Sequence, residues 1–486
     1  MVAYQTSIII EEKSGLPVYR QIANGMISLI QQGKLKPGSF VPGTRQLAVA
    51  LNVHRNTVIN AYNELLAQNW IEALPRKGYR VLPDLVVRKP RSFKPGANYA
   101  GHNFDTIASE NVLCHLFNEA GVNDIVVNDG LPDINLMPFD EMMKGYRKII
   151  KSLHRGSANT FQSLGENKHL QRATCTFLND LRGLYVTPDQ MLITRGAQMA
   201  IYIAANVLVN RGDHIVLTDP NYLIADEVFK QLGAVIHRIP IDDNGPDVNL
   251  LAQLLQTTDI KLLYLAPHYH HPTTVTMSLD RRIKLHELLN EFKFWLIEDD
   301  CDYDFQFKNY PVVPLASGQH QGRIIYIGSF TKLLSPQFRV SYLVGPKDFI
   351  KKAMSYRRII DTDGDVLLEE SLAAMISTGE LIRHINKSNK LYRFRCELAC
   401  RLIRESLGHA VQFKQPTGGF AIWLKFSADN PLSEIIPKAA AAGLFLTGSA
   451  YYLGEDKKHN GIRFGFASLS ENELYKAVDI LKQIIV

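Results

Sequence analysis

RIIYIGSFTKLLSPQFRVSYLVGP, residues 323–346, decides what the larger part of this chain can be. The apolar run before Gly328 predicts a buried strand, and its carboxyl end delivers Ser329 and Lys332, with Arg339 seven residues after the lysine. A lysine amine can form an imine with an aldehyde, while a hydroxyl and a guanidinium can hold a phosphate. The spacing therefore indicates a site for a phosphorylated aldehyde such as pyridoxal 5′-phosphate (PLP). Taken alone, it is also typical of a surface lysine and arginine, or of the S-x-x-K motif of serine acylases.

The composition is that of a globular protein with several domains. At 486 residues the chain is long enough for two to four domains and a sizeable core. Its apolar runs all fall short of the roughly 18 residues of a membrane span, so we expect a soluble, cytoplasmic protein. The five cysteines are scattered and odd in number, which favours reduced thiols over a disulfide framework. They are Cys114, Cys175, Cys301, Cys396 and Cys400.

Positive charge is concentrated at the start of the chain. Residues 1–83 contain nine Lys and Arg against four Glu, which leaves +5, and the formal net charge of the whole chain is +6. A small basic module joined to a nearly neutral body is typical of a head that binds a polyanion.

Residues 1–82 have the pattern of a winged helix-turn-helix domain. Thr44 is placed to cap a short second helix, and a longer helix is expected from Arg55 to about Asn69. Amides on one side of that helix suit base edges in a major groove, and two short strands around Lys77-Gly78 form the wing. The buried stripe of the first helix is predicted to be Val18, Ile22, Met26 and Leu29, and the exposed amides are Asn56, Asn60 and Asn63.

The rest of the chain predicts a tether and an α/β body. Residues 83–124 are rich in proline and positive charge and are expected to form a linker. In residues 125–360 short apolar strands alternate with helices, which indicates a mostly parallel sheet covered by helices. Residues 361–486 predict a smaller α+β domain. The expected strands of the large sheet are MLIT, HIVLT, AVIHRI, KLLYLA, FWLIE, RIIYIG and RVSYLVG.

Several predicted strand ends carry residues suited to a cofactor. Ala197 and Gln198 open a helix whose free backbone N–H groups can bind phosphate. Tyr222 offers an aromatic face for stacking, and Asp299 can pair with a pyridinium N–H. Each feature alone fits an ordinary helix cap, turn or acidic loop, but together they precede Lys332 in order.

Two family resemblances follow from these motifs. KLKPGSFVPGTRQLAVALNVHRNTVINAYNELLAQNWIEALPRKGYRV resembles the DNA-binding domain of GntR-family regulators. The resemblance implies that Arg45, Arg55 and Thr57 contact DNA. NDGLPDINLMPFD, TRGAQMAIYIAA, DPNYL, IEDDCDYDF, SFTKLLSPQFRVSYLVGP and IRFGFASLSENEL resemble fold-type I aminotransferases, and the order of head, linker and body resembles the MocR/GabR subfamily.

The second resemblance implies roles for the body's residues. Lys332 becomes the Schiff-base (aldimine) lysine, and Arg463 falls where the family holds a ligand carboxylate. The implied cofactor-binding residues are Ala197, Gln198, Tyr222, Asp299, Ser329, Lys332 and Arg339.

The sequence departs from the subfamily pattern at two places. Cys301 stands where a tyrosine is usual, and Tyr303 is the nearest tyrosine. His268-Tyr269-His270-His271-Pro272-Thr273-Thr274 replaces a run that normally ends in glycine. These histidines could suggest a metal, but the spacing favours altered contacts at the cofactor's edge, and no metal site is expected.

Three functions fit the sequence. The first, which we favour, is a PLP-dependent transcriptional regulator that binds double-stranded operator DNA, senses an amino compound or PLP itself through an aldimine at Lys332, and forms a homodimer. We expect no steady turnover from it, although a residual aminotransferase half-reaction is compatible with its residues. The second is a working aminotransferase with an appended DNA-binding head. The third, an interaction body without PLP, would leave Lys332 without a role. The effector, the operator and the direction of regulation do not follow from the sequence.

Overall fold

The computed structural model describes residues 4–11, 14–85, 121, 124–155, 168–307, 312–361, 364–447 and 459–485. The chain divides into two compact units, Met1–Phe104 and Asp105–Val486. Most of the predicted tether, residues 86–120 and 122–123, lies outside the described residues, as does Cys114.

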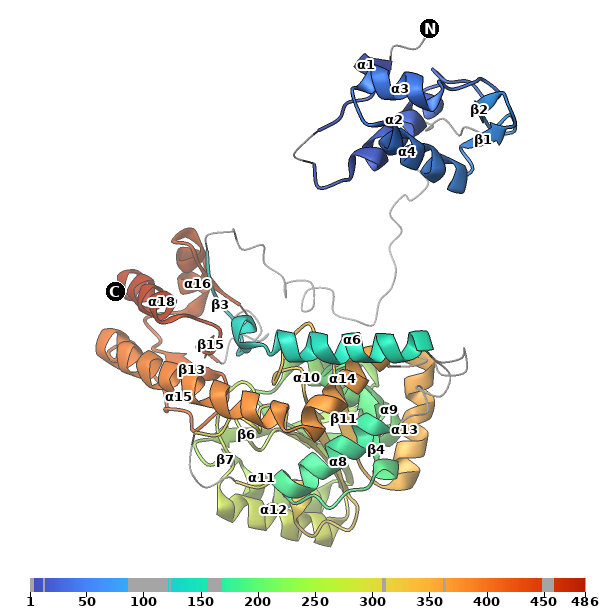
Figure 1. The fold of residues 1–486 in the computed structure, drawn as a ribbon. Helices are drawn as coiled ribbons and strands as arrows, with labels where there is room; N and C mark the ends of the chain where they lie inside the picture. The colour runs from blue at the N-terminus through green and yellow to red at the C-terminus, as the bar shows by residue number, and fades with distance from the viewer. Residues whose placement is uncertain are drawn as a thin grey trace. The chain divides into compact units, whose positions relative to one another are not determined.

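The first unit is a small helical domain with a two-stranded wing (Figure 1). Its elements are α1 (Tyr4–Ser7), α2 (Val18–Gln31), α3 (Thr44–Leu51), α4 (Arg55–Ala67), β1 (Ile71–Leu74) and β2 (Gly78–Val81). β1 and β2 pair antiparallel. Ile22, Met26 and Leu29 of α2 are buried as predicted, while Val18, its first residue, is 36% exposed. The predicted cap of α3 is wrong by one residue, because Thr44 begins the helix and Gly43 is its N-cap, without a side-chain bond.

The second unit is built on an eight-stranded sheet in the order β4-β11-β10-β9-β8-β5-β6-β7. The five strands from β10 to β6 are parallel, whereas β11 runs antiparallel to both its neighbours and β7 runs antiparallel to β6. The predicted mostly parallel sheet is therefore confirmed. The strands are β4 (Met191–Thr194), β5 (His214–Asp219), β6 (Val235–Asp242), β7 (Gly245–Pro246), β8 (Ile260–Leu265), β9 (Trp295–Asp299), β10 (Ile324–Ser329) and β11 (Ser341–Val344).

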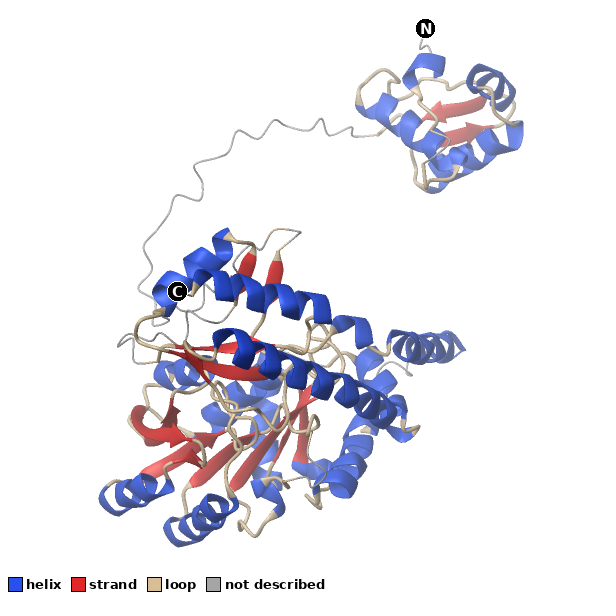
Figure 2. Cartoon of the chain, turned by 90° about the vertical axis from the view of Figure 1, so that its left-hand side faces the viewer, coloured by secondary structure: helices blue, strands red, loops and turns tan. Residues whose placement is uncertain are grey.

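Helices cover both faces of this sheet (Figure 2). One face buries apolar side chains against α9 (Ala197–Leu208), α10 (Leu223–Gln231) and α13 (Lys347–Ile360). The other face packs on α11 (Val248–Thr257) and α12 (Leu279–Phe292), and at its β4 end on α8 (His169–Arg182) and α14 (Val366–Ser377). Because both faces are buried, the strands are continuous apolar runs rather than alternating ones.

The C-terminal part adds smaller sheets and long helices. β12 (Val411–Gln412), β13 (Ala421–Phe426) and β15 (Gly461–Gly465) form an antiparallel sheet, and β14 (Leu444–Leu446) pairs in parallel with β3 (Ile125–Val127). Its helices are α15 (Glu380–Leu407), α16 (Leu432–Ala441) and α18 (Glu471–Ile484), and α6 (Phe139–Arg155) packs along α14 (Figure 1). Cys396 and Cys400 are buried in α15, as predicted.

Among the helices that the structure describes, none combines the length and the apolar character needed to cross a membrane.

Candidate functional site

A cavity of about 250 Å³ lies beyond the carboxyl ends of the central strands. This is the edge at which an open α/β sheet builds its binding site. All seven residues predicted to bind the cofactor line it: Ala197, Gln198, Tyr222, Asp299, Ser329, Lys332 and Arg339. A larger cavity of about 520 Å³ shares the wall residues His268 and Tyr269 with it.

Lys332 follows β10 and lies at the centre of this constellation. Its ammonium donates to Asp302 Oδ1 at 2.5 Å, and the lysine side chain is 22% exposed. Among the described residues that line the cavity, Lys332 therefore supplies the primary amine, and a buried carboxylate holds it in place.

One end of the cavity is shaped for a phosphate. Gly196, the N-cap of α9, has φ +85°, and a Cβ there would lie 2.6 Å from Arg339 Nη2. Only glycine leaves room for the guanidinium beside the free N–H groups of the helix start. Arg339 also donates to Gln198 Oε1 at 3.4 Å, and Ser329 Oγ accepts from the hydroxyl of Ser341 at 2.8 Å.

Asp299, at the end of β9, is buried and lines the same cavity. Burial raises its pKa, whereas hydrogen bonds from the Cys301 thiol and the Tyr264 hydroxyl oppose the rise. Tyr264 donates to Asp299 Oδ2 at 2.6 Å. Tyr222 forms the neighbouring aromatic wall, and its hydroxyl accepts from Gln198 Nε2 at 3.2 Å.

Arg463 lies behind the cavity wall and is not among the residues that line it. Its side chain is 1% exposed, and Nη2 donates to Asp302 Oδ2 at 3.1 Å. The structure thus connects Lys332 and Arg463 through Asp302. In this structure the carboxylate of Asp302 accepts the hydrogen bond that Nη2 could otherwise donate to a ligand carboxylate.

The histidines of residues 268–271 have separate partners and do not converge on one point. Nδ1 of His268 binds Asp300 at 2.8 Å, Nε2 of His270 binds Thr218 at 2.9 Å, and Nε2 of His271 binds Asp129 at 2.7 Å. Burial lowers the pKa of His270 to about 3 and also lowers that of His271, so both rings are neutral near pH 7. The altered loop contributes His268, Tyr269 and His271 to the wall of the cavity.

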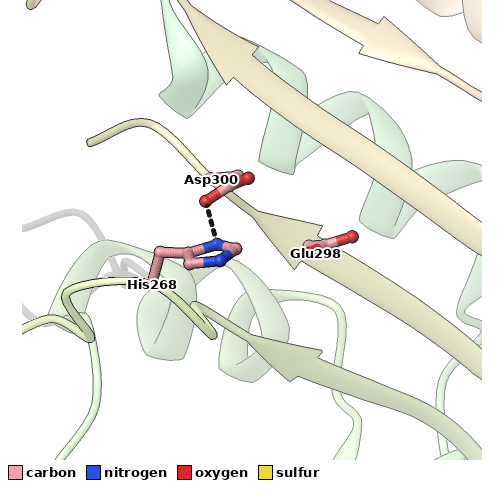
Figure 3. Close-up of side chains that lie close together, drawn as sticks. All are labelled: His268, Glu298 and Asp300. Atoms are coloured by element: carbon pink, nitrogen blue, oxygen red, sulfur yellow. Dashed lines mark hydrogen bonds and ion pairs between the residues drawn. The ribbon is translucent and has the colours of Figure 1, made fainter. Parts of the chain in front are cut away.

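His268 does meet two carboxylates, Glu298 and Asp300, in a fully buried cluster with the possible ligand atoms within 4.8 Å of one another (Figure 3). Both oxygens of Glu298 already accept backbone N–H groups, from Leu315 and Ala316, at 2.7 Å. Burial and the neighbouring Asp300 raise the pKa of Glu298 to about 8. A neutral, hydrogen-bonded Glu298 accounts for this cluster as part of the core, and the absence of a metal remains a prediction.

Sequence reasoning missed two residues of the site and one behind it. Asp302 and Tyr264 both line the cavity, where Asp302 binds Lys332 and Tyr264 binds Asp299. The sequence motifs that contain them do not indicate these partners. Arg182 is 1% exposed and pairs with Asp304 at 2.6 Å beneath the site. Tyr303, the nearest tyrosine to Cys301, packs its ring 4.4 Å from the Arg182 guanidinium and does not line the cavity.

The predicted DNA contacts lie in the first unit and are independent of this cavity. Arg45 is exposed on α3, Arg55 begins α4 exposed, and Thr57 follows half-buried. Asn56, Asn60 and Asn63 are exposed on α4 as predicted. His54 is the N-cap of α4 and accepts from Asn56 N at 3.3 Å, so it takes the part that a serine usually plays.

The donor set of the cavity fits PLP. One pocket is lined by a primary amine, a buried carboxylate, an aromatic ring and a hydroxyl. A guanidinium, that of Arg339, lies in the same pocket against Gly196 at the start of α9. The carboxylate suits a pyridine N–H and the guanidinium suits a phosphate. These pairings correspond to the two ends of that molecule.

Comparison with known proteins agrees with both units. Residues 131–481 match the family described as aminotransferase class I and II, and residues 18–81 match the gntR family of bacterial regulatory proteins. The chain is 28% identical over 466 residues to the uncharacterized HTH-type transcriptional regulator YisV of Bacillus subtilis, covering 95% of each chain. It is 24% identical to the probable rhizopine catabolism regulatory protein MocR of Rhizobium meliloti, over 98% of this chain and 95% of that protein.

Among solved structures, the chain resembles Pyrococcus horikoshii kynurenine aminotransferase in complex with PMP, with a TM-score of 0.67 and 26% identity over 75% of this chain and 91% of that one. The cofactor of this aminotransferase fold is PLP, as predicted from the sequence. The chain belongs to the aminotransferase class I and II family and, with a gntR-type helix-turn-helix domain at its start, has the organisation of the MocR-type regulators.

Proposed function

We propose that this chain is a PLP-dependent, DNA-binding transcriptional regulator that senses an amino compound, or PLP itself, at Lys332. One observation supports it above the others. The cavity gathers Lys332, Asp299 and Arg339 in a chain whose other unit is a gntR-type helix-turn-helix domain. A DNA-binding head has no part in transamination, so the combination favours sensing.

Each residue has a defined task in this proposal. PLP, when bound, supplies an aldehyde carbon that reacts reversibly with primary amines. Lys332 would hold it through its amine, Asp299 would accept the ring N–H, and Tyr222 would offer its ring for stacking. The residues that would hold the phosphate are Ala197, Gln198, Ser329 and Arg339.

The head and body communicate through the tether. We propose a winged helix-turn-helix domain at 1–82, a linker at 83–124, a large domain at 125–360 and a small domain at 361–486. Arg45, Arg55 and Thr57 contact DNA, and a homodimer reads two half-sites. An amino compound bound at the cofactor in place of Lys332 would change the contact between Lys332 and Asp302. Such a change is the differential interaction that a ligand needs to shift a conformational population.

The test begins with Lys332→Ala in the full-length protein. The variant should lose the visible absorbance of bound PLP and the effect of added amines on DNA binding, while its basal DNA binding persists. Lys347→Ala, at an exposed lysine paired with Asp189, is the control and should keep both. Borohydride reduction followed by peptide mapping should label Lys332, and a label on another lysine would contradict the assignment.

The runner-up is a working aminotransferase with an appended DNA-binding head. The 26% identity to kynurenine aminotransferase over most of that chain favours it. The two functions differ in stoichiometry, so the protein is mixed with amino-acid and oxo-acid panels and the keto product is counted per site. Many turnovers, with operator affinity indifferent to the ligand, would establish the enzyme instead.

A further inference from the structure

The ammonium of Lys332 lies against two buried groups from distant parts of the chain. Asp302 Oδ1 accepts from it at 2.5 Å, and the ring centroid of Phe420 lies 5.8 Å from Nζ. The second distance is within the range of a cation–π interaction. Asp302 follows β9 and is 6% exposed, whereas Phe420 directly precedes β13 and is fully buried. The large sheet and the C-terminal part therefore both contribute to the surroundings of this ammonium.

Both groups are held in place by their own neighbours. Asp302 uses its other oxygen, Oδ2, to accept from Arg463 Nη2 at 3.1 Å. The ring centroid of Phe420 lies 4.7 Å from that of Phe305 and 5.4 Å from that of Tyr392. The contacts offered to the ammonium are therefore preorganised by packing and hydrogen bonding.

The charged groups beside Lys332 balance when the lysine is an ammonium. Lys332 and Arg463 are then the cations, and Asp302 and Asp129 are the carboxylates, with Asp129 Oδ1 3.6 Å from Arg463 Nε. His271, which binds Asp129, adds no charge near neutral pH, because burial lowers its pKa. Removing the charge of Lys332 would leave one carboxylate uncompensated in a largely buried place, which costs free energy.

Ligand exchange returns an ammonium to Lys332. In the proposed function, the primary amine of a ligand takes the place of Lys332 at the aldehyde carbon of the cofactor. The bond from that carbon to Nζ breaks as the bond to the ligand nitrogen forms, and no oxidant or reductant is needed. Because the new carbon–nitrogen bond carries as many protons as the old one, the protons that the ligand ammonium gives up pass to Nζ. A lysine ammonium released in this buried place needs a partner.

We infer that Asp302 and Phe420 are positioning residues that receive the ammonium of Lys332 when an amino compound replaces the lysine at the cofactor. They set how far the exchange proceeds, because each contact that the released lysine makes favours the exchanged state. This inference rests on the proposed function, since it concerns the lysine that the ligand displaces. It gives a role to two residues outside the set that holds the cofactor.

The test measures the binding of n-butylamine to the full-length, PLP-loaded protein from its visible spectrum. This probe has no carboxylate, so its affinity reports the exchange of amines and not a contact with Arg463. Asp302→Asn should weaken n-butylamine binding at least about tenfold, because the released ammonium loses a charge-assisted hydrogen bond. The affinity for PLP itself, measured by titrating the PLP-free protein, should stay the same or rise, because PLP binding gives up that same hydrogen bond.

A second variant and two controls locate the effect. Phe420→Leu keeps every charge and should weaken n-butylamine binding about threefold, which tests the inference even if Asp302→Asn fails to fold. Phe294→Leu is its control, because Phe294 is also buried but belongs to another apolar cluster. Asp219→Asn is the control for the aspartate, because Asp219 pairs with His459 at 2.7 Å and does not line the cavity. Both controls should keep the wild-type affinities.

The outcomes separate this inference from the proposed function. A parallel loss of affinity for PLP and for n-butylamine would mean a merely structural role and overturn the inference, as would n-butylamine affinities that neither variant changes. A wild-type protein that responds to amino acids but not to n-butylamine also overturns it, because the contacts of the released lysine would then not drive the exchange. A wild-type spectrum and DNA binding that no amine changes overturn the proposed function, and the inference with it.

Discussion

Burial and two hydrogen-bond donors act in opposite directions on the pKa of Asp299, and burial has the larger effect. Burial raises its pKa, and the Cys301 thiol and the Tyr264 hydroxyl counteract this by binding the charged form. A carboxylate that stays ionised holds a pyridine N–H more strongly, because the hydrogen bond is then charge-assisted. We therefore expect Tyr264, which also lines the cavity, to support cofactor binding through its hydrogen bond to Asp299.

Tyr264→Phe should weaken PLP binding at least about tenfold, since a hydrogen bond to a charged group contributes about 1.5–3 kcal/mol. Titration of the protein with PLP, followed by visible absorbance, measures the loss. Tyr342→Phe is the matched control, because the buried Tyr342 hydroxyl has no hydrogen-bond partner among the described residues. Equal affinities for the two variants would show that the Tyr264 hydroxyl has no such role.

Residues of the site differ in how far the sequence could predict them. Lys332, Asp299 and Ser329 follow apolar runs directly, so a strand and its end were enough to place them. Arg182 and Asp302 act through partners far along the chain, Asp304 and Arg463, and a pattern of local spacing carries no information on such pairs. The position of Arg463 behind the cavity wall also depends on such a pair, so the sequence pattern could not predict it.

At the scale of elements, charged side chains of α13 and of the start of α14 lie close together. Glu369 in its first turn lies near Arg357, Asp361 and Asp365, and it is half-buried. Burial raises its pKa to about 7, and the two aspartates add to the rise while Arg357 opposes it. The folded state is therefore more stable when Glu369 is protonated.

The sign of the resulting pH dependence is fixed. Between pH 4.5 and about 7 the folded state binds a proton at Glu369 that the unfolded state has lost, so stability falls as the pH rises through this window. Glu369→Gln should reduce the decrease in melting temperature between pH 5 and pH 8. Glu434→Gln, at an exposed glutamate of α16, should retain the wild-type decrease. A Glu369→Gln variant with an unchanged pH profile would contradict this.

The positions of helices and strands were predictable where they depend on local sequence pattern alone. Apolar periodicity located α2 and α4 and the strands of the large sheet. Apolar periodicity did not place β3, because its partner β14 lies more than 300 residues away. It also could not show that β11 runs antiparallel, because strand direction depends on the connection between strands rather than on composition. The cap of α3 moved by one residue because a Pro-Gly turn supplies the extended backbone before Thr44.

At the scale of the whole molecule, the two units have separate cores and separate sites. The first unit carries the positive charge, with nine Lys and Arg against four Glu in residues 1–83. The second binds the ligand in our proposal. In our proposal, a ligand at Lys332 alters DNA binding through the way in which the two heads of a homodimer are presented.

The salt dependence of DNA binding tests this arrangement. Each phosphate neutralised on duplex DNA contributes about −0.9 to the slope of log affinity against log salt concentration. If two heads of a homodimer occupy two half-sites, the full-length protein should show about twice the slope of a fragment of residues 1–104. This fragment keeps the basic part of the tether and removes the body. Light scattering should give a dimeric mass for the full-length protein with PLP and a monomeric mass for the fragment. Equal slopes, or a monomeric full-length protein at micromolar concentration, would mean that the body does not pair the heads, and regulation would then have to act on each head's own contacts with DNA.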